Sequence, residues 1–139
     1  MSDIHIRCAA VSEIDTVLRF WRTSAEGTSI SDDNDGVARL LSRDPEALLI
    51  AEHDGALVGT VIAGFDGWRC SAYRLAVHPD HRRQGIATAL LEAAEQRFAA
   101  LGGRRVDAMV LEANEPAHLA WDAAGYHREQ HWRRWVKTL

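Results

Sequence analysis

The stretch from Val77 to Arg97 places two arginines and a glycine immediately before an alanine-rich helical pattern. It reads VHPDHRRQGIATALLEAAEQR, with Arg82, Arg83 and Gly85 at the expected start of the helix. The first N–H groups of a helix have no partner within it, and the aligned peptide dipoles place partial positive charge there. Phosphate and pyrophosphate are natural ligands of such an end. The pattern indicates an anion site built from backbone, although a solvated surface helix would show it too.

Other ligand motifs are missing from the sequence. A P-loop requires GxxxxGK[ST] and a dinucleotide fold requires GxGxxG, and neither occurs. The chain has seven histidines, but His78 and His81 lie beside two arginines, which would disfavour a cation. No HExxH or Cys/His cluster is present. We therefore expect no metal.

Composition limits the classes of protein that need to be considered. A length of 139 residues suits a single domain, 1–139, with a substantial core. The net charge of -4 disfavours nucleic-acid binding, and the Trp/Arg mixture HWRRWVK more simply predicts a terminal strand with Trp132 or Trp135 inward. No secretory signal or membrane-spanning apolar run is visible. We expect a cytoplasmic protein with Cys8 and Cys70 reduced.

Periodicity and turn residues predict the elements that position the anion site. Two Asp-Gly pairs separate three apolar runs, as in an antiparallel meander. The expected order is β-α-α-β-β-β-α-β-α-β, a mixed and mostly antiparallel twisted sheet flanked by helices in an α/β (α+β) fold. The expected strands lie near 3–10, 47–53, 56–65, 70–77, 105–113 and 126–139, and the expected helices at 13–25, around 37–43, at 85–101 and from about 116 to Gly125.

Arg82-x-x-Gly85-x-Ala87, following a strand that ends Val77-x-Pro79, resembles the [RQ]-x-x-G-x-[GA] acetyl-CoA motif of the GNAT N-acetyltransferases. The order of elements matches that fold over essentially the whole chain. The stretch GTVIAGFDGWRCSAYRLAVHPDHRRQGIATALL further resembles the bacterial YpeA-type members. The resemblance implies a GNAT fold and transfer of acetyl from acetyl-CoA to a primary amine, either small or on a peptide.

The resemblance also implies where the cofactor binds. Its pyrophosphate would lie on the N–H groups from Arg83 to Thr88. Its pantetheine arm would pair with backbone groups at Leu75 and Val77, where two strands splay apart. Asn114 would contact the cofactor, cap the next helix, or do both. The complete set of expected cofactor-binding residues is Leu75, Ala76, Val77, Arg82, Arg83, Gln84, Gly85, Ile86, Ala87, Thr88, Asn114 and Trp121.

The resemblance transfers to the catalytic groups only in part. Family members typically carry a tyrosine acid in the helix after the asparagine, and aligning NEPAHLAWDAAGY places Trp121 there. An indole N–H donates hydrogen bonds but is not a useful acid near neutral pH. The hydroxyls of Tyr126 and Tyr73 are possible substitutes. For a general base, Glu112 lies two residues before Asn114 and could act through water. A solvated carboxylate would look the same, and the chain offers Glu52 and Asp66 as alternatives.

The acceptor is suggested only by the segment SISDDNDG, which in the family borders the acceptor cleft. Its aspartates, Asp32, Asp33 and Asp35, would draw in cationic amines. Alternatively, the segment is a solvated loop in which Asp35 caps the second helix. A non-enzymatic acyl-CoA sensor of the same fold is the second hypothesis, because Trp121 replaces the expected acid. A homodimer is left open, and no membrane or nucleic-acid partner is expected.

Overall fold

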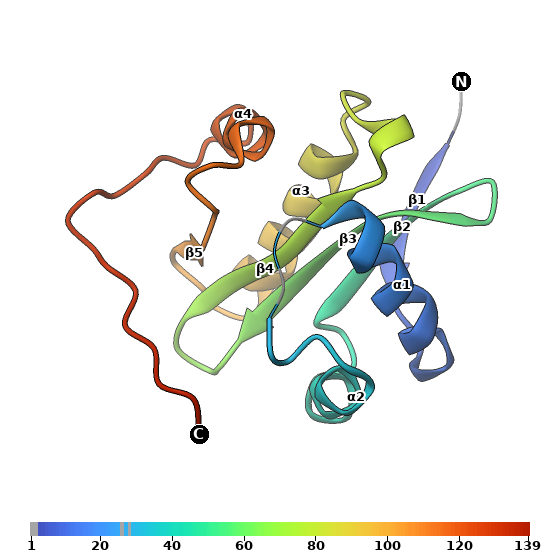
Figure 1. Ribbon diagram of the computed structural model, residues 1–139, viewed down its shortest axis with the longest axis horizontal. Helices are drawn as coiled ribbons and strands as arrows, with labels where there is room; N and C mark the ends of the chain where they lie inside the picture. The colour runs from blue at the N-terminus through green and yellow to red at the C-terminus, as the bar shows by residue number, and fades with distance from the viewer. Residues whose placement is uncertain (1–2, 26, 28) are drawn as a thin grey trace.

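The computed structural model describes residues 3–25, 27 and 29–139. The described residues form a five-stranded sheet in the order β1-β2-β3-β4-β5. Its strand pairs are antiparallel except for the parallel β4–β5 pair (Figure 1). The elements are β1 (Ile4–Cys8), η1 (Val11–Glu13), α1 (Ile14–Ser24), α2 (Asn34–Arg43), β2 (Leu48–His53), β3 (Ala56–Phe65), β4 (Cys70–Val77), η2 (Pro79–His81), α3 (Ile86–Ala100), β5 (Val106–Ala108) and α4 (Glu115–Ala123), where η marks a 3-10 helix.

The meander of β2, β3 and β4 confirms the prediction from the Asp-Gly pairs. Asp54 and Gly55 join β2 to β3 with φ of 51° and 79°, the left-handed conformation that a tight hairpin turn requires. Gly67, in the longer turn between β3 and β4, has a φ of 96°. Both hairpins are therefore specified by residues a few positions apart, which is why their positions could be predicted from the sequence.

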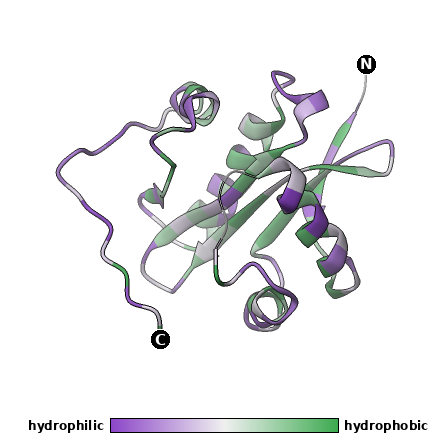
Figure 2. Cartoon of the chain, viewed as in Figure 1, coloured by the Kyte–Doolittle hydropathy of each residue, from purple (hydrophilic) through white to green (hydrophobic). Residues whose placement is uncertain are grey.

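The sheet has helices on both faces. In Figure 1, α1 and α2 lie in front of the strands and α3 lies behind them. Alternate residues of β2 serve the two layers: Leu48 and Ile50 join the core under α1 and α2, and Leu49 and Ala51 join the core under α3. Figure 2 shows the result as hydrophobic strands between helices with polar outer surfaces. Period-two alternation thus builds two cores from one strand.

A glycine in β3 lets α3 lie close to the sheet. A Cβ atom at Gly59 would be 2.9 Å from both Ile86 Cγ2 and Leu90 Cδ1. These two side chains are almost fully buried and come from the first turn and a half of α3. The missing side chain therefore fixes how closely the N-terminal end of α3 approaches β3, and so where the expected anion site lies.

Two predictions about the C-terminal third were wrong. β5 ends at Ala108 rather than continuing to 113, and within the described chain residues 127–139 form no strand. Trp132 and Trp135 do not point inward: they are 70% and 93% exposed. An alternating sequence becomes a strand only when a neighbour satisfies its backbone groups, and this segment leaves α4 and runs away from the sheet (Figure 1). No described helix is long and apolar enough to cross a membrane.

Candidate functional site

The two last strands of the sheet separate after a short paired region. Their parallel pairing covers only Cys70 to Ala72 on β4 and Val106 to Ala108 on β5. β4 continues to Val77, whereas the opposing chain turns to coil from Met109 onward. A cavity of about 100 Å³ lies in the gap, and it is lined by Ala25, Ala72, Arg74, Leu75, Met109, Val110, Leu111, Asn114, Ala117 and Trp121. The sequence-predicted Leu75, Asn114 and Trp121 therefore meet in one cleft.

A β-bulge in β4 forms one wall of this cleft. Between the pairs Ile62–Tyr73 and Thr60–Ala76, β4 has one residue more than β3. Arg74 occupies the bulge with a φ of 51°, a left-handed conformation that is unusual for a residue other than glycine. The bulge shifts the register of β4 against β3, and no motif in the sequence predicted it.

Buried hydrogen bonds hold the bulge in place. The Thr60 hydroxyl donates to the carbonyl oxygen of Arg74 at 2.8 Å and accepts from Trp21 Nε1 at 2.9 Å. Thr60 has no exposed surface, and Trp21 is 5% exposed. Trp21, a side chain of α1, thus reaches the bulge through the buried core. Its indole N–H and the Thr60 hydroxyl both have hydrogen-bond partners.

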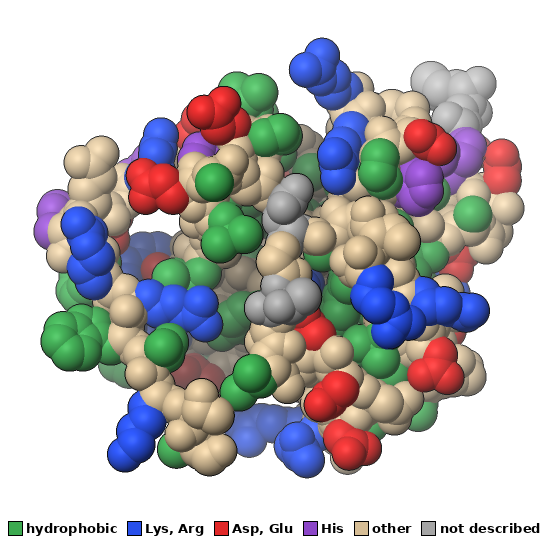
Figure 3. Space-filling view, in the orientation of Figure 1, with side chains coloured by type: hydrophobic (Ala, Val, Ile, Leu, Met, Phe, Trp, Pro, Cys, Tyr) green, Lys and Arg blue, Asp and Glu red, His purple; other side chains and the backbone are tan. Residues whose placement is uncertain are grey.

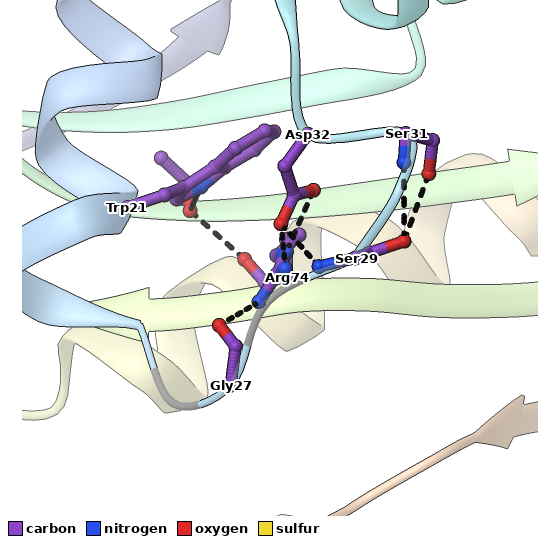
Figure 4. Close-up of polar contacts among 7 residues, drawn as sticks. Trp21, Gly27, Ser29, Ser31, Asp32 and Arg74 are labelled. Atoms are coloured by element: carbon purple, nitrogen blue, oxygen red, sulfur yellow. Dashed lines mark hydrogen bonds and ion pairs between the residues drawn. The ribbon is translucent and has the colours of Figure 1, made fainter.

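Arg74 also ties the segment between α1 and α2 to the sheet (Figure 4). Its guanidinium forms an ion pair with Asp32, in which Nε lies 3.1 Å from Oδ1, and it donates to the Gly27 carbonyl at 3.4 Å. Asp32 additionally accepts from the Ser29 amide at 3.1 Å. Burial lowers the pKa of Arg74 from its ordinary value. The segment that was expected to border the acceptor cleft is therefore attached directly to the cleft wall.

The aspartates of this segment have distinct roles. Asp32 is largely neutralised by Arg74, whereas Asp33 caps α2 by accepting from the Gly36 amide at 2.7 Å. The cap is thus Asp33 and not the expected Asp35. Asp35 is exposed in the first turn of α2, where a negative charge suits the helix dipole.

The expected anion site lies beyond the C-terminal end of β4, which is at Val77. After η2, Arg83 and Gly85 adopt left-handed φ values of 63° and 79°, and α3 begins at Ile86. Gly85 caps α3 without a side chain, and a Cβ atom there would meet nothing within 4 Å. Arg82 to Gly85 are exposed, and Arg82 Nε donates to the Val77 carbonyl at 3.3 Å. The unpartnered amides of the first turn therefore face open space beside two arginines.

The start of α4 contributes a residue with two uses. Asn114 caps the helix, with its side-chain oxygen accepting from the Ala117 amide at 3.3 Å, and it also lines the cleft. Trp121 lines the same cleft about two turns later along α4. Its ring meets that of Tyr126 edge to face, with centroids 4.8 Å apart.

Neither tyrosine lies in the cleft lining. Tyr126 donates its hydroxyl to Glu95 on α3 at 2.8 Å, and burial, together with that carboxylate, raises the pKa of the phenol well above its ordinary value. Tyr73 is 51% exposed and sits on β4 next to the bulge. Tyr126 thus serves as a packing residue, and its committed hydroxyl is not available as the substitute acid.

The candidate bases also lie outside the cleft lining. The Glu112 side chain is 94% exposed and lies 3.8 Å from Arg128. Glu52 is held by Arg7 from β1. Asp66 accepts the amides of Arg69 and Trp68 in the β3–β4 turn, and these bonds lower the pKa of its carboxyl. Among the described residues, the general base is not identified by geometry, and Glu112 stays a prediction.

Comparison with known proteins defines the class. The model of the acetyltransferase (GNAT) family matches residues 12–126. An acetyltransferase of Yersinia enterocolitica is 38% identical over 112 residues, which cover 81% of this chain and 79% of the relative. The chain therefore belongs to the GNAT acetyltransferase family and is an acyltransferase.

Solved structures agree on the fold. The aminoglycoside N-acetyltransferase AAC(6')-Iy, in complex with CoA, has a TM-score of 0.77 and 17% identity, covering 100% of this chain and 97% of its own. The yncA acetyltransferase of Salmonella typhimurium, with its cofactor acetyl-CoA, has a TM-score of 0.72 and 19% identity, covering 89% of this chain and 79% of its own. At these identities the likeness concerns the fold.

The hydroxyl of Thr60 makes a direct prediction. Thr60→Val keeps the shape of the side chain but leaves Trp21 Nε1 and the Arg74 carbonyl without their partner. We expect the free energy of unfolding in urea to fall by about 1–3 kcal/mol, with faster amide exchange around Arg74. Thr23→Val is the matched control, because the Thr23 hydroxyl bonds the Phe20 carbonyl on an exposed helix surface. If both variants lose the same free energy of unfolding, the hydrogen bonds of Thr60 to Trp21 and Arg74 stabilise the fold no more than an exposed hydroxyl does.

Proposed function

We propose that this chain transfers an acetyl group from acetyl-CoA to a primary amine by direct attack on the thioester. The observation that carries the proposal is the divergence of β4 from β5. The part of β4 beyond this divergence runs from the small cleft toward the glycine-capped start of α3. The acetyl-CoA of the yncA structure and the CoA of the AAC(6')-Iy structure support the choice of cofactor.

The cofactor would use two backbone features. Its pyrophosphate would accept from the N–H groups between Arg83 and Thr88, where helix dipole and arginine charge act together. Its pantetheine arm would pair with Leu75 and Val77 as an added strand, on the side of β4 that has diverged from β5. Ala76, between them, is buried in the core under α1 and α2. Ala76 would therefore hold β4 to the core, while Leu75 and Val77 on either side of it would bind the pantetheine arm.

Asn114 would give the cofactor a hydrogen-bond donor. Its side-chain oxygen is already used in the α4 cap. The amide of asparagine carries two further N–H groups. These N–H groups would donate to a carbonyl of the cofactor. The one side chain would thus cap α4 and bind the cofactor at the same time.

The chemistry would need little from side chains. The acceptor ammonium loses a proton, and the neutral amine bonds to the carbonyl carbon. The attached nitrogen then loses a second proton to water, and the C–S bond breaks to release the amide and a thiolate. Trp121 stands where related enzymes are expected to carry an acid, and it can stabilise by hydrogen bonding but not protonate. The thiolate would therefore leave unprotonated and take its proton from solvent. Glu112 would accept the acceptor proton only through water, given its exposure.

A second function, cofactor sensing without transfer, is favoured by one observation. Trp121 lines the cleft in place of an acid, and it packs on Tyr126, whose hydroxyl is committed to Glu95. A sensor would bind acetyl-CoA but release no thiol with any amine. Thiol release measured over a panel of polyamines, amino acids and peptides separates the two functions.

We further propose that the acceptor is cationic. The sequence segment before α2 is acidic, but Asp32 is paired with Arg74, so the charge available to an acceptor belongs to Asp33 and Asp35. Asp33 ends the loop that Arg74 anchors, and Asp35 follows it in the first turn of α2. The aminoglycoside acceptor named for AAC(6')-Iy, a structure with the same fold, is in keeping with this choice.

Gly85 tests the cofactor site. Gly85→Leu introduces a side chain into the open space above the first turn of α3, and it also strains a residue at positive φ by about 1–2 kcal/mol. Gly102→Leu is the matched control: it has a φ of 89° and open surroundings at the opposite end of α3. Calorimetry should show acetyl-CoA binding to Gly102→Leu and strongly weakened binding to Gly85→Leu. Unchanged affinity in folded Gly85→Leu would exclude the site.

Trp121 tests the route of the thiolate. Without a side-chain acid, kcat should show no falling limb at high pH that reports a tyrosine. Trp121→Phe should keep kcat within about threefold, because only a weak hydrogen bond is lost, and Trp121→Tyr should raise it. A large loss of kcat in Trp121→Phe, at normal acetyl-CoA affinity, would assign a catalytic role to the indole N–H and contradict the mechanism.

Asp33 and Asp35 test the acceptor charge. Asp33→Asn with Asp35→Asn removes both charges, and asparagine remains a good cap for α2. The KM for a polyamine should rise severalfold at low salt and little at high salt, while a monoamine is nearly unaffected. Asp32→Asn is a poor test, since it breaks the Arg74 pair and loosens the loop. Equal effects on polyamine and monoamine would rule out selection by charge.

A further inference from the structure

The cleft between β4 and the chain after β5 is lined mainly by apolar side chains. Eight of the residues that line it are alanine, leucine, methionine, valine or tryptophan: Ala25, Ala72, Leu75, Met109, Val110, Leu111, Ala117 and Trp121. Among the described lining residues, the polar side chains are those of Arg74 and Asn114. Both already have partners, Arg74 in Asp32 and Asn114 in the cap of α4. The lining therefore favours a ligand group with an apolar surface over a strongly hydrated one.

Two large apolar side chains at this cleft are also open to water. Met109 and Leu111, in the coil after β5, are 66% and 55% exposed although they line the cleft. Figure 3 shows hydrophobic side chains gathered left of the centre of the view, where the chain between β5 and α4 lies in Figure 1. Exposed apolar side chains that gather at a cleft are typical of a ligand-binding surface. Covering them with an apolar ligand group would contribute to binding.

These exposed side chains lie on the side of the cleft that the loop between α1 and α2 borders. A Cβ atom at Gly27 would be 3.2 Å from Leu111 Cδ1, so the loop lies against the wall after β5. The ion pair of Asp32 with Arg74 attaches the same loop to the wall formed by β4. In the proposed function this is the acceptor side of the cleft, whereas the cofactor uses the backbone of β4. The apolar surface is therefore assigned to the acceptor.

The size of the cleft limits the shape of the acceptor. Its volume of about 100 Å³ corresponds to roughly three water molecules of the liquid. The loop is attached to both walls, by Gly27 beside Leu111 and by Asp32 on Arg74, and these attachments oppose widening of the cleft. A short chain of methylenes fits such a space, whereas a branched or cyclic body does not.

The two carboxylates proposed to attract a cationic acceptor lie outside the cleft lining. Asp33 caps α2, Asp35 is exposed in the first turn of that helix, and neither lines the cleft. They follow Asp32, which is held at the cleft wall by Arg74, and three residues span at most about 10 Å. A positive charge that reaches them is therefore separated from the reacting nitrogen by the part of the acceptor that fills the cleft.

We infer that the acceptor carries its reacting nitrogen on a short, unbranched apolar arm, with any further positive charge beyond that arm. The arm lies against Met109 and Leu111, and the nitrogen at its end attacks the thioester. Burial of the nitrogen also favours the neutral amine over the ammonium, and the neutral amine is the form that attacks. This inference rests on the proposed acetyl transfer and names the substrate class of its acceptor site.

Linear primary amines from ethylamine to octylamine test the arm, because their apolar surface grows while their basicity stays nearly constant. The kcat/KM for thiol release from acetyl-CoA should rise about twofold to fourfold for each of the first few methylenes. It should then level off, when the chain outgrows the cleft, and cyclohexylamine should react more slowly than hexylamine. A flat series in an active enzyme overturns this inference alone. Thiol release with no amine at all overturns the acetyl transfer and this inference together.

Substitutions at the cleft identify the surface that the arm contacts. Leu111→Ser should flatten the rise of kcat/KM with chain length, and Met109→Ser should do so while leaving Leu111 against Gly27. Leu119→Ser is the matched control, because Leu119 is a 67% exposed leucine of α4 outside the cleft lining, and its series should match the unsubstituted protein. Equal flattening in Leu111→Ser and Leu119→Ser would contradict the inference.

Two further series separate the arm from its alternatives. With one amine and acyl-CoA donors from acetyl to hexanoyl, Leu111→Ser should leave the relative rates of the donors unchanged; an effect confined to the donors would assign the apolar surface to the acyl chain instead. Among diamines, 1,2-diaminoethane should react more slowly than propylamine, because its second ammonium enters the cleft. The longer 1,6-diaminohexane should react at least as fast as hexylamine. Equal rates for the short and the long diamine would rule out an apolar arm.

Discussion

The hydrogen bond from the Thr60 hydroxyl to the Arg74 carbonyl holds the bulge on which the geometry of the cleft depends. One extra residue in β4 shifts the strand relative to β3, and pairing with β5 stops just before that residue. The bulge is costly by itself, because Arg74 takes a left-handed φ. It persists because Trp21, Thr60 and Asp32 each satisfy a polar group of the relay or of Arg74.

The same residue links two functions of the site. Through its backbone Arg74 shapes the strand that would receive the pantetheine arm, and through its guanidinium it anchors the loop at the acceptor side. A disturbance of α1, of the loop or of β3 would therefore reach the cleft by short, buried contacts. In the proposed function, the geometry of both cofactor and acceptor would depend on this one point in the sheet.

The anion site relies on a different principle. Its parts are local: a left-handed glycine, two arginines and the first turn of α3. One distant requirement is Gly59, whose missing side chain lets α3 approach β3. Local construction is why the glycine-led start of α3, on which the predicted anion site rests, could be located from the sequence, together with both hairpins and the Asn114 cap. Catalytic groups were harder to locate, because Glu112 is exposed and both tyrosines lie outside the cleft lining.

The sequence by itself determined the elements whose causes lie within a few residues. These include the Asp-Gly turn at Gly55, the glycine-led start of α3, the helical spacing from Ile86 to Phe98, and the order of elements from β1 to α4. Tertiary structure decided what depends on partners far along the chain: the Arg74–Asp32 pair across 42 positions, the bonding of Tyr126 to Glu95, the short β5 and the unpaired C-terminal segment. Periodicity records which faces of a segment are apolar, but a strand forms, and a charge is neutralised, only where the fold brings a partner to it.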